Sequence, residues 1–178
     1  SQMFNARSKI IKKEDAKPTD LEDEVAKCLY QLEMGKPSPI KDNLSQVLIN
    51  SAELVEYQQQ GGNYSKTLFI RIPFRSLNAF HKVSEEAVQH LEQKFQWPVI
   101  VIATRTIISK RAKRHRTQKR PRSRTLQSVH QAVLEDIVYP ATITGRQTRV
   151  TLDGKKHIKL FLDPLDKEKA ENKLEAMA

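Results

Sequence analysis

The chain has 178 residues, of which 38% are hydrophobic and 29% are charged, and its formal net charge at pH 7 is +10. A chain of this length buries a substantial core as one domain, and its single cysteine, Cys28, excludes an internal disulfide bond and fits a reducing compartment. No apolar run approaches the ~20 residues of a membrane span and no secretory signal is visible, so the composition indicates a cytosolic or nuclear protein without membrane helices.

The first predicted helix follows a basic N-terminal arm, residues 1–17, which has no core of its own. Thr19 and Glu22 match a capping box, in which each side chain binds a free backbone N–H at the start of a helix. Apolar residues then recur at helical spacing until Gly35 ends the helix. Because Cys28 belongs to this apolar stripe, the sequence predicts that it packs in the core and is not a nucleophile.

A β-hairpin is predicted after a short helical turn at residues 40–46. Apolar residues alternate with polar ones over 47–57 and again over 68–74, which is the pattern of half-buried strands. A Gly61-Gly62-Asn63 turn signal lies between them. The two strands are therefore expected to pair antiparallel.

A helix and a buried strand are predicted next. Ser76 is expected to cap the helix, whose apolar stripe runs over 77–95 and stops before Pro98. Residues 99–103 are continuously apolar and mostly β-branched, as in a strand that is buried on both faces. Strand, helix and strand in this order predict a right-handed parallel crossover.

Another helix is predicted to begin after Thr125, which is a suitable cap. Its apolar residues fall on one face between Leu126 and Ile137. Glu135 and Asp136 are expected on the opposite side, in solvent.

The last predicted elements are a hairpin and a highly charged helix. The Asp153-Gly154 pair indicates a two-residue type I′ turn, and Asp163-Pro164 indicates the start of the helix. The sequence as a whole predicts one α+β domain over residues 1–178. It combines a mixed β-sheet with antiparallel hairpins and one parallel β-α-β crossover, helices packed on the sheet, and a long basic loop over 110–124.

The basic loop concentrates the positive charge of the chain. Nine of the fifteen residues from Lys110 to Arg124 are Lys or Arg, and none is acidic or aromatic. Between Gln93 and Leu134 there are eleven cations and no Asp or Glu, so subtracting eleven from the net charge of +10 leaves −1 for everything else. These sums predict a nearly neutral body that carries one concentrated positive feature.

Three interpretations of this run remain: solvated charge without function, a nuclear localisation signal, and a nucleic-acid contact. Unpaired like charges at this density repel one another, which favours a polyanionic partner. The run has no aromatic residue for base stacking, and its six Arg and three Lys suit the phosphates and grooves of structured RNA. The residues predicted to bind RNA are Lys110, Arg111, Lys113, Arg114, His115, Arg116, Lys119, Arg120, Arg122 and Arg124.

No motif for catalysis is present. The chain has no glycine-rich nucleotide-binding motif, no metalloprotease motif and no paired cysteines, and its five histidines are scattered. His130 lies on an apolar helix face, where packing explains it better than chemistry. The sequence predicts no enzyme, no metal and no cofactor, and an RNA-modifying enzyme such as a nuclease is a third and remote alternative.

One block of sequence is more specific than composition. It reads Lys119-Arg120-Pro121-Arg122-Ser123-Arg124-Thr125-Leu126 and is followed by Val129-His130, Ala132 and Leu134-Glu135-Asp136. Shorter stretches agree in order along nearly the whole chain: Met3-Phe4, Leu32-Glu33-Met34 and Leu152-Asp153-Gly154. Together these motifs resemble the eukaryote-specific small-subunit ribosomal protein seven family, whose members continue past the position of Ala178 with an aromatic-rich tail.

The resemblance implies a structural component of the small (40S) ribosomal subunit that binds 18S rRNA through the basic loop. It also implies contacts with neighbouring small-subunit ribosomal proteins and with assembly factors, and a role in subunit assembly and pre-rRNA processing. Assembly in the nucleolus, a cytoplasmic location on the ribosome, and no membrane or small-molecule partner follow from the same resemblance. A nucleolar or nuclear adaptor that binds structured RNA outside the mature ribosome is the alternative that the same residues leave open.

Overall fold

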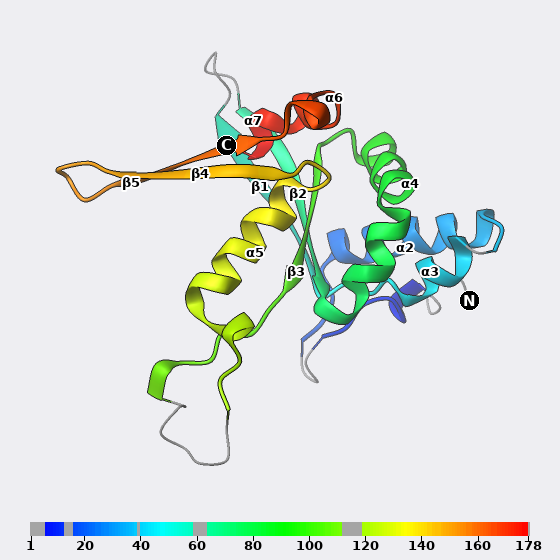
Figure 1. Ribbon diagram of the computed structural model, residues 1–178. Coiled ribbons are helices and arrows are strands. Elements are labelled where there is room, and N and C mark those ends of the chain that lie inside the picture. Colours follow the sequence, from blue (N-terminus) through cyan, green and yellow to red (C-terminus); the bar gives the residue numbers. More distant parts are fainter. Residues whose placement is uncertain (1–5, 13–15, 39, 59–63, 112–118, 178) are drawn as a thin grey trace.

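The structure is a computed structural model that describes residues 6–12, 16–38, 40–58, 64–111 and 119–177. The described elements form a three-stranded sheet with helices packed on it and a separate two-stranded sheet, which confirms the predicted α+β class (Figure 1). The helices are α2 (Asp20–Gly35), α3 (Ile40–Gln46), α4 (Leu77–Phe95), α5 (Leu126–Val138), α6 (Lys167–Ala170) and α7 (Leu174–Met177), and the strands are β1 (Ser51–Gln58), β2 (Tyr64–Pro73), β3 (Val99–Thr104), β4 (Ile143–Val150) and β5 (Lys156–Leu162).

The three-stranded sheet has the order β1-β2-β3. Strands β1 and β2 pair antiparallel, whereas β3 pairs parallel to β2 after the chain has returned through α4. The predicted hairpin and the predicted parallel crossover are therefore both confirmed. The turn signal at 61–63 lies outside the described residues.

The first strand begins later than its sequence pattern predicts. Val47 and Ile49 alternate and are buried, but β1 starts only at Ser51. Ile49 instead forms an isolated parallel bridge with Ile10 of the N-terminal segment, in which Ile11 N donates to Ile49 O at 2.7 Å. The alternation was real, but its pairing partner is a distant segment and not the hairpin.

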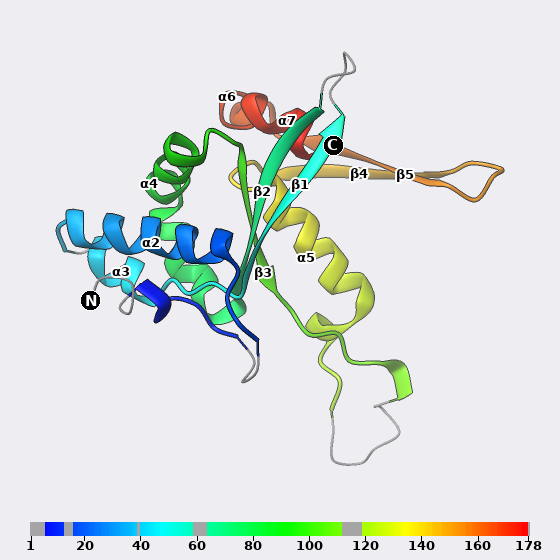
Figure 2. The same ribbon diagram turned by 180° about the vertical axis from the view of Figure 1, so that it is seen from behind.

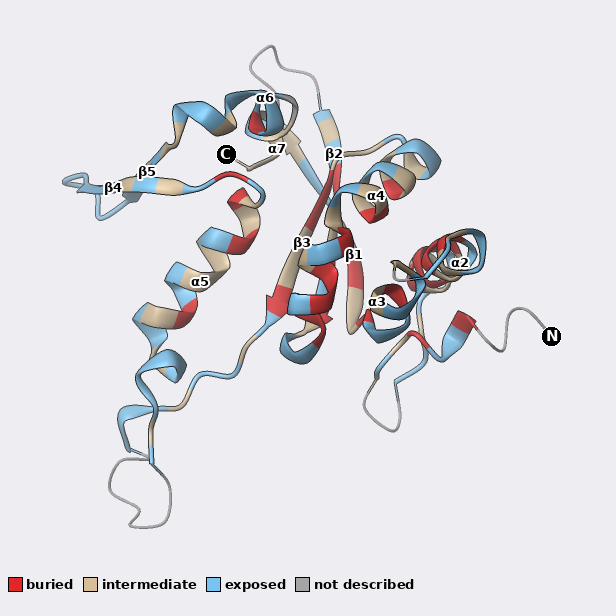
Figure 3. Ribbon diagram, turned by 45° about the vertical axis from the view of Figure 1, so that its right-hand side comes forward, coloured by how far each residue is buried: buried red, intermediate tan, exposed pale blue. Residues whose placement is uncertain are grey.

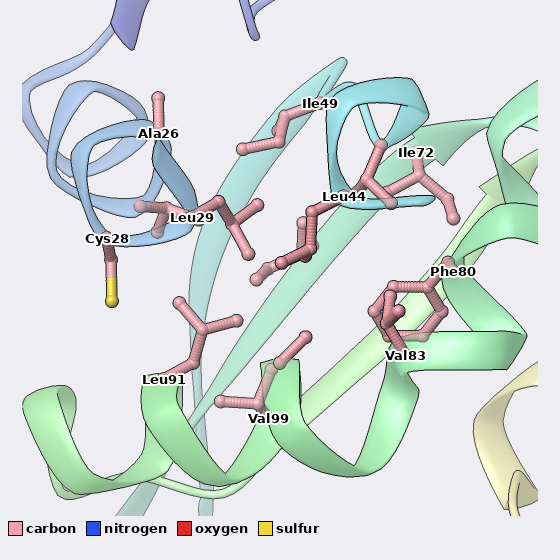
Figure 4. Packing of buried hydrophobic residues seen from close by; sticks show 14 of the residues in the cluster. Ala26, Cys28, Leu29, Leu44, Ile49, Ile72, Phe80, Val83, Leu91 and Val99 are labelled. Atoms are coloured by element: carbon pink, nitrogen blue, oxygen red, sulfur yellow. The ribbon is translucent and has the colours of Figure 1, made fainter. Parts of the chain in front are cut away.

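The main core lies between the sheet and helices α2, α3 and α4, which lie together on one side of it (Figure 2). Side chains from all three helices and from the sheet meet there, among them Leu29, Leu44 and Leu91 (Figure 4). Cys28 belongs to this core, with its Sγ 3.0 Å from His90 Nδ1, and burial raises the pKa of the thiol. The prediction that it packs and does not react is consistent with this environment.

Glu22 joins three segments of the chain at the start of α2. The predicted capping box is present, because Thr19 N donates to Glu22 Oε2 at 2.9 Å and Glu22 N donates to Thr19 Oγ1 at 3.3 Å. Glu22 Oε1 also accepts hydrogen bonds from Lys12 Nζ at 2.7 Å and from Ala52 N at 3.4 Å. Burial opposes ionisation of this carboxyl, but the hydrogen bonds from Lys12 and from the two backbone amides lower its pKa overall.

Replacing Glu22 with Gln is expected to lower the free energy of unfolding by about 1–3 kcal/mol at neutral pH, because the cap is retained while the charge facing Lys12 is lost. The folded-state pKa lies below the ordinary value of 4.5, so the advantage of the carboxylate exists above that value and disappears as pH falls through the folded-state pKa. Urea unfolding at several pH values measures it, with Glu24→Gln at an exposed site as the control. A deficit that persists in acid would contradict the electrostatic explanation.

The N-terminal segment packs on the body and adds to its core. Ala6 is buried, and Lys9 is buried with its Nζ 2.6 Å from Glu33 Oε2 and 2.5 Å from Leu44 O. Ile10 packs against the main core, so the described residues 6–12 of the predicted basic arm join the body and form no separate core.

Ser76 does not cap α4 as predicted. It has helical backbone angles and no capping hydrogen bond, and its Oγ instead donates to Gln46 O at 2.8 Å. The hydroxyl therefore links the start of α4 to the end of α3.

Helix α5 lies on the other side of the sheet, against β3, and its orientation corrects one prediction. Glu135 is exposed as expected, but Asp136 is only 7% exposed. Val129 is buried seven residues before Asp136, so both lie on the face of α5 that meets the sheet. Leu126 is 54% exposed, although it belongs to the predicted apolar stripe. The buried face is therefore rotated toward Asp136.

The outer edge of β3 is bound by side chains from other parts of the chain. The contacts are Val99 N to Glu92 Oε1 (3.1 Å), Lys173 Nζ to Val99 O (3.4 Å), Ala103 N to Asp136 Oδ2 (2.9 Å) and Arg105 Nη1 to Ala103 O (3.3 Å). An edge strand presents unpaired backbone groups, and here those of Val99 and Ala103 bind these charged side chains.

Strands β4 and β5 form a second antiparallel sheet that is separate from the first, and they extend far from the body (Figure 1). Their turn is not the predicted type I′ turn, because only Gly154 has a positive φ, of 80°. Thr151 N donates to Lys155 O and Gly154 N donates to Thr151 O, both at 2.9 Å, which makes a three-residue loop with Gly at the left-handed position.

The remaining described elements are short and pack at the base of this second sheet. The predicted last helix is divided into α6 and α7 by a 3₁₀ turn. Ala170 of α6 packs with Val138 and Ala141 in a small second core. Burial is concentrated at the main sheet and its helices, whereas most of β4 and β5 is exposed (Figure 3). None of the described helices is both long and apolar enough to span a membrane.

Candidate nucleic-acid interface

The basic loop joins the end of β3 to the start of α5, and its two ends are held together. Ile108 N donates to Arg124 O at 3.0 Å, so the outgoing and returning chains meet beside the first turn of α5. The described ends of the loop lie away from the sheet (Figure 1). The predicted contact residues Lys113, Arg114, His115 and Arg116 lie outside the described residues, whereas Lys110, Arg111, Lys119, Arg120, Arg122 and Arg124 are described.

Local hydrogen bonds fix the backbone that carries the last arginines of the loop. Arg122–Arg124 form a 3₁₀ turn, in which Thr125 N donates to Arg122 O at 3.2 Å. Thr125 Oγ1 donates to Arg122 O at 2.8 Å and accepts from Ser128 N, which confirms Thr125 as the cap of α5. Arg122 and Arg124 are exposed on this ordered turn. Their guanidinium groups are thus presented to solvent from a defined backbone.

The described cations of the loop have no acidic partner among the described residues, whereas nine cations elsewhere in the chain do. Nine salt bridges join described residues, and none includes Lys110, Arg111, Lys119, Arg120, Arg122 or Arg124. Arg120 also has a buried Nε without a hydrogen-bond partner among the described residues. Unpaired cations at this density favour an anionic ligand that brings several charges at once.

Arg105 stands at the base of the loop but has a structural role. Its Nη2 donates to Asp136 Oδ1 at 3.0 Å, and its Nη1 donates to Asp136 Oδ2. The guanidinium also lies 5.6 Å from the centre of the Phe74 ring, in cation–π geometry. Arg105 is 13% exposed and Asp136 6% exposed at the side chain, so this ion pair is largely dry and fixes the chain leaving β3 relative to α5.

The far end of α5 is held by α4. The ring of Tyr139 stacks on His81 with their centres 4.4 Å apart, and its hydroxyl lies 3.1 Å from Ser84 Oγ. Burial lowers the pKa of His81, which keeps the ring neutral in this contact. These residues line a cavity of about 680 Å³ between α4, α5 and the C-terminal helices. Helix α5 is therefore fixed at both ends.

The structural roles of Asp136 and Arg105 were not predicted from the sequence. Asp136 was assigned to solvent, although its spacing of seven residues from the apolar Val129 would have placed it on the buried face. Arg105 was counted among the eleven cations between Gln93 and Leu134, and its ion pair was not predicted. Within the described residues, no group of three or more His, Cys, Asp or Glu could hold a metal ion.

Comparison with known proteins identifies the family. A family model described as ribosomal protein S7e matches residues 9–178. The small ribosomal subunit protein eS7 of Avicennia marina is 44% identical over 177 residues, which are 99% of this chain and 90% of that protein. Its namesake from Schizosaccharomyces pombe is 43% identical over 173 residues, 96% of this chain and 86% of that protein. The Drosophila melanogaster protein is 38% identical over 172 residues, 94% of this chain and 85% of that protein. In agreement with its sequence motifs, the chain belongs to the ribosomal protein S7e family.

Proposed function

We propose that this chain is a structural constituent of the small ribosomal subunit and that it binds 18S rRNA through the basic loop. Family membership supports the first part and confirms the prediction that the chain is not an enzyme. The observation that carries the second part is that the described cations of the loop lack acidic partners, while nine cations elsewhere have them. The loop thus carries charge that the protein itself does not neutralise.

The loop binds chiefly the phosphate backbone. Guanidinium groups fit phosphate oxygens with two parallel hydrogen bonds, and the ordered turn at Arg122–Arg124 presents two of them in a defined direction. The described part of the loop offers no aromatic residue, so the shape of folded RNA is recognised and not its bases. Each phosphate contact releases counterions, which makes the affinity depend on salt.

The same proposal extends to assembly. A loop that neutralises phosphates helps rRNA segments to approach one another, which supports a role in subunit assembly and pre-rRNA processing, beginning in the nucleolus and ending on cytoplasmic ribosomes. Neighbouring ribosomal proteins and assembly factors are the other partners. The exposed Leu126 on the outer side of α5 gives such proteins an apolar contact beside the loop.

The affinity of the purified chain for a transcript of 18S rRNA is expected to fall by about 10³-fold or more between roughly 50 and 200 mM KCl, because six or more phosphates are contacted. Filter binding over a salt series measures it. A flat salt dependence would contradict binding through the loop.

Sedimentation distinguishes the two candidate roles. A structural constituent stays with small subunits after a high-salt wash. A chain that binds the transcript but is washed away from the subunits would favour the alternative, an RNA-processing adaptor that acts outside the mature ribosome.

A further inference from the structure

The β4–β5 ribbon, residues 143–162, is a second basic feature of the chain. It contains five cations (Arg146, Arg149, Lys155, Lys156 and Lys159) and one acid (Asp153), a net charge of +4. Everything outside the window 93–134 sums to −1, so removing the +4 of the ribbon from that part leaves −5. The body is therefore not nearly neutral, as the sequence sums predicted, but acidic with two separate basic extensions.

The strand register sorts the ribbon residues onto two faces. Residues directly opposite each other share a face, so Gln147 with Lys159 and Arg149 with His157 lie on one side. Phe161 is on that side too, opposite Gly145. We call this side the Phe161 face. Arg146 and Lys156 lie on the other side, with Leu160, which packs on the small second core.

The Phe161 face combines positive charge with an exposed ring. Phe161 is 45% exposed and rests on Gly145, where an added Cβ would lie 3.3 Å from the ring. Lys159 Nζ lies 5.2 Å from the ring centre. Arg149, His157 and Lys159 are exposed, and the face has no acidic residue. Cations beside an accessible aromatic ring are the combination that binds the phosphates and bases of nucleic acids.

The β1–β2 hairpin provides an internal comparison. Its exposed cations are neutralised across the strands, with Lys66 3.1 Å from Glu56 and Arg71 3.1 Å from Glu53. Among the described residues, no cation of the β4–β5 ribbon has such a partner. Because no cross-strand ion pair uses the charge of the ribbon cations, that charge is available to a ligand.

We propose that the Phe161 face of the β4–β5 ribbon is a second RNA-contact surface, separate from the basic loop. Arg149 and Lys159 bind backbone phosphates, and Phe161 packs on an unpaired base or a ribose beside them. The ribbon is ~25 Å long and two strands wide. Because the major groove of A-form RNA is deep and narrow, the ribbon lies along the backbone and minor groove instead. The choice of RNA over another polyanion rests on the proposed function.

Helix α5 sets the distance between the two surfaces. It has 13 residues, about 20 Å, and its ends are held by the Thr125 cap and by Tyr139. The loop precedes it and the ribbon follows it, and the two project in different directions (Figure 2). Two weak contacts at a fixed spacing on one RNA strengthen each other, because the second forms within the complex.

The test compares two double variants that each remove two charges from the ribbon. Arg149→Gln with Lys159→Gln is expected to lower affinity for the 18S rRNA transcript about tenfold and to reduce the salt slope by about 2. Arg146→Gln with Lys156→Gln, on the opposite face, is expected to lower it by at most about threefold. Phe161→Leu is expected to weaken binding without changing the salt slope, because stacking is not electrostatic. Thermal unfolding verifies that each variant is folded.

Each other outcome has a definite meaning. Equal losses from the two double variants would overturn the assignment to the Phe161 face, since only net charge would matter. Unchanged RNA affinity would overturn the inference, and if incorporation into small subunits then failed, the ribbon would be identified as a protein contact. A third variant replaces Arg120, Arg122 and Arg124 of the basic loop with Ala. Loss of affinity from this variant alone would refute the ribbon and leave the proposed function standing. Loss from the Arg149 and Lys159 variant alone would support the ribbon and refute binding through the loop.

Discussion

A variant with Arg120, Arg122 and Arg124 replaced by Ala is expected to fold normally and to be absent from small ribosomal subunits. The three side chains have no acidic partner among the described residues, so their removal costs the fold little. In a complex with RNA, the three substitutions would remove three charge-assisted phosphate contacts. Each lost contact is expected to lower the affinity about tenfold. Sucrose-gradient sedimentation of tagged chains, with detection of the tag across the gradient, measures incorporation.

Two matched variants separate charge from geometry and from position. Replacing the same three arginines with Lys keeps the charge but removes the guanidinium fork, and partial incorporation is expected. Replacing Lys17, Lys41 and Arg75 with Ala removes three exposed charges that have no acidic partner in the described part of the chain, and it is expected to leave incorporation intact. If that body variant were lost from the subunit as completely as the loop variant, the loop would have no special role.

Asp136→Ala is expected to lower the free energy of unfolding by about 3–5 kcal/mol, because it leaves Arg105 buried without its counter-charge. Ala103 also loses its hydrogen-bond acceptor, which lies 2.9 Å away in the intact protein. Urea denaturation measures the change from the midpoint at constant slope. This loss concerns the fold, so RNA binding should fail only as far as the protein unfolds.

The adjacent residue provides the control. Glu135 is exposed and receives one hydrogen bond, from Gln131, so Glu135→Ala should change stability by less than about 0.5 kcal/mol. A double-mutant cycle with Arg105→Ala should show strong coupling, with the second substitution costing much less than the first. Additive losses would mean that the two side chains stabilise the fold independently.

Local signals predicted local structure. The capping box at Thr19 and Glu22 and the cap at Thr125 were confirmed, because donor and acceptor are within three residues of each other. Partners far away in sequence were not visible. Ser76 binds the carbonyl of Gln46, and Ile49 pairs with Ile10, so the predicted cap and the early start of the first strand were wrong.

Of the two proposed contact surfaces, the loop was predicted from the sequence because its charge is contiguous. The ribbon was missed because its charge is dispersed. The loop at 110–124 is recognisable because its cations are consecutive in sequence. The ribbon at 143–162 was hidden, because its +4 cancels against acidic residues elsewhere when the charge of the body is summed. Only the strand register brings Arg149 and Lys159 to one face, where an aromatic ring lies beside Lys159.

The side chains bound to the outer edge of β3 also affect how copies of the protein interact. A strand from a second copy would need the backbone groups of Val99 and Ala103, which four side chains of the same chain already occupy. These side chains are charged, and an incoming strand would have to displace and partly desolvate them. The contacts at this edge, two of which also fix the chain leaving β3 relative to α5, therefore protect the protein against strand-to-strand aggregation.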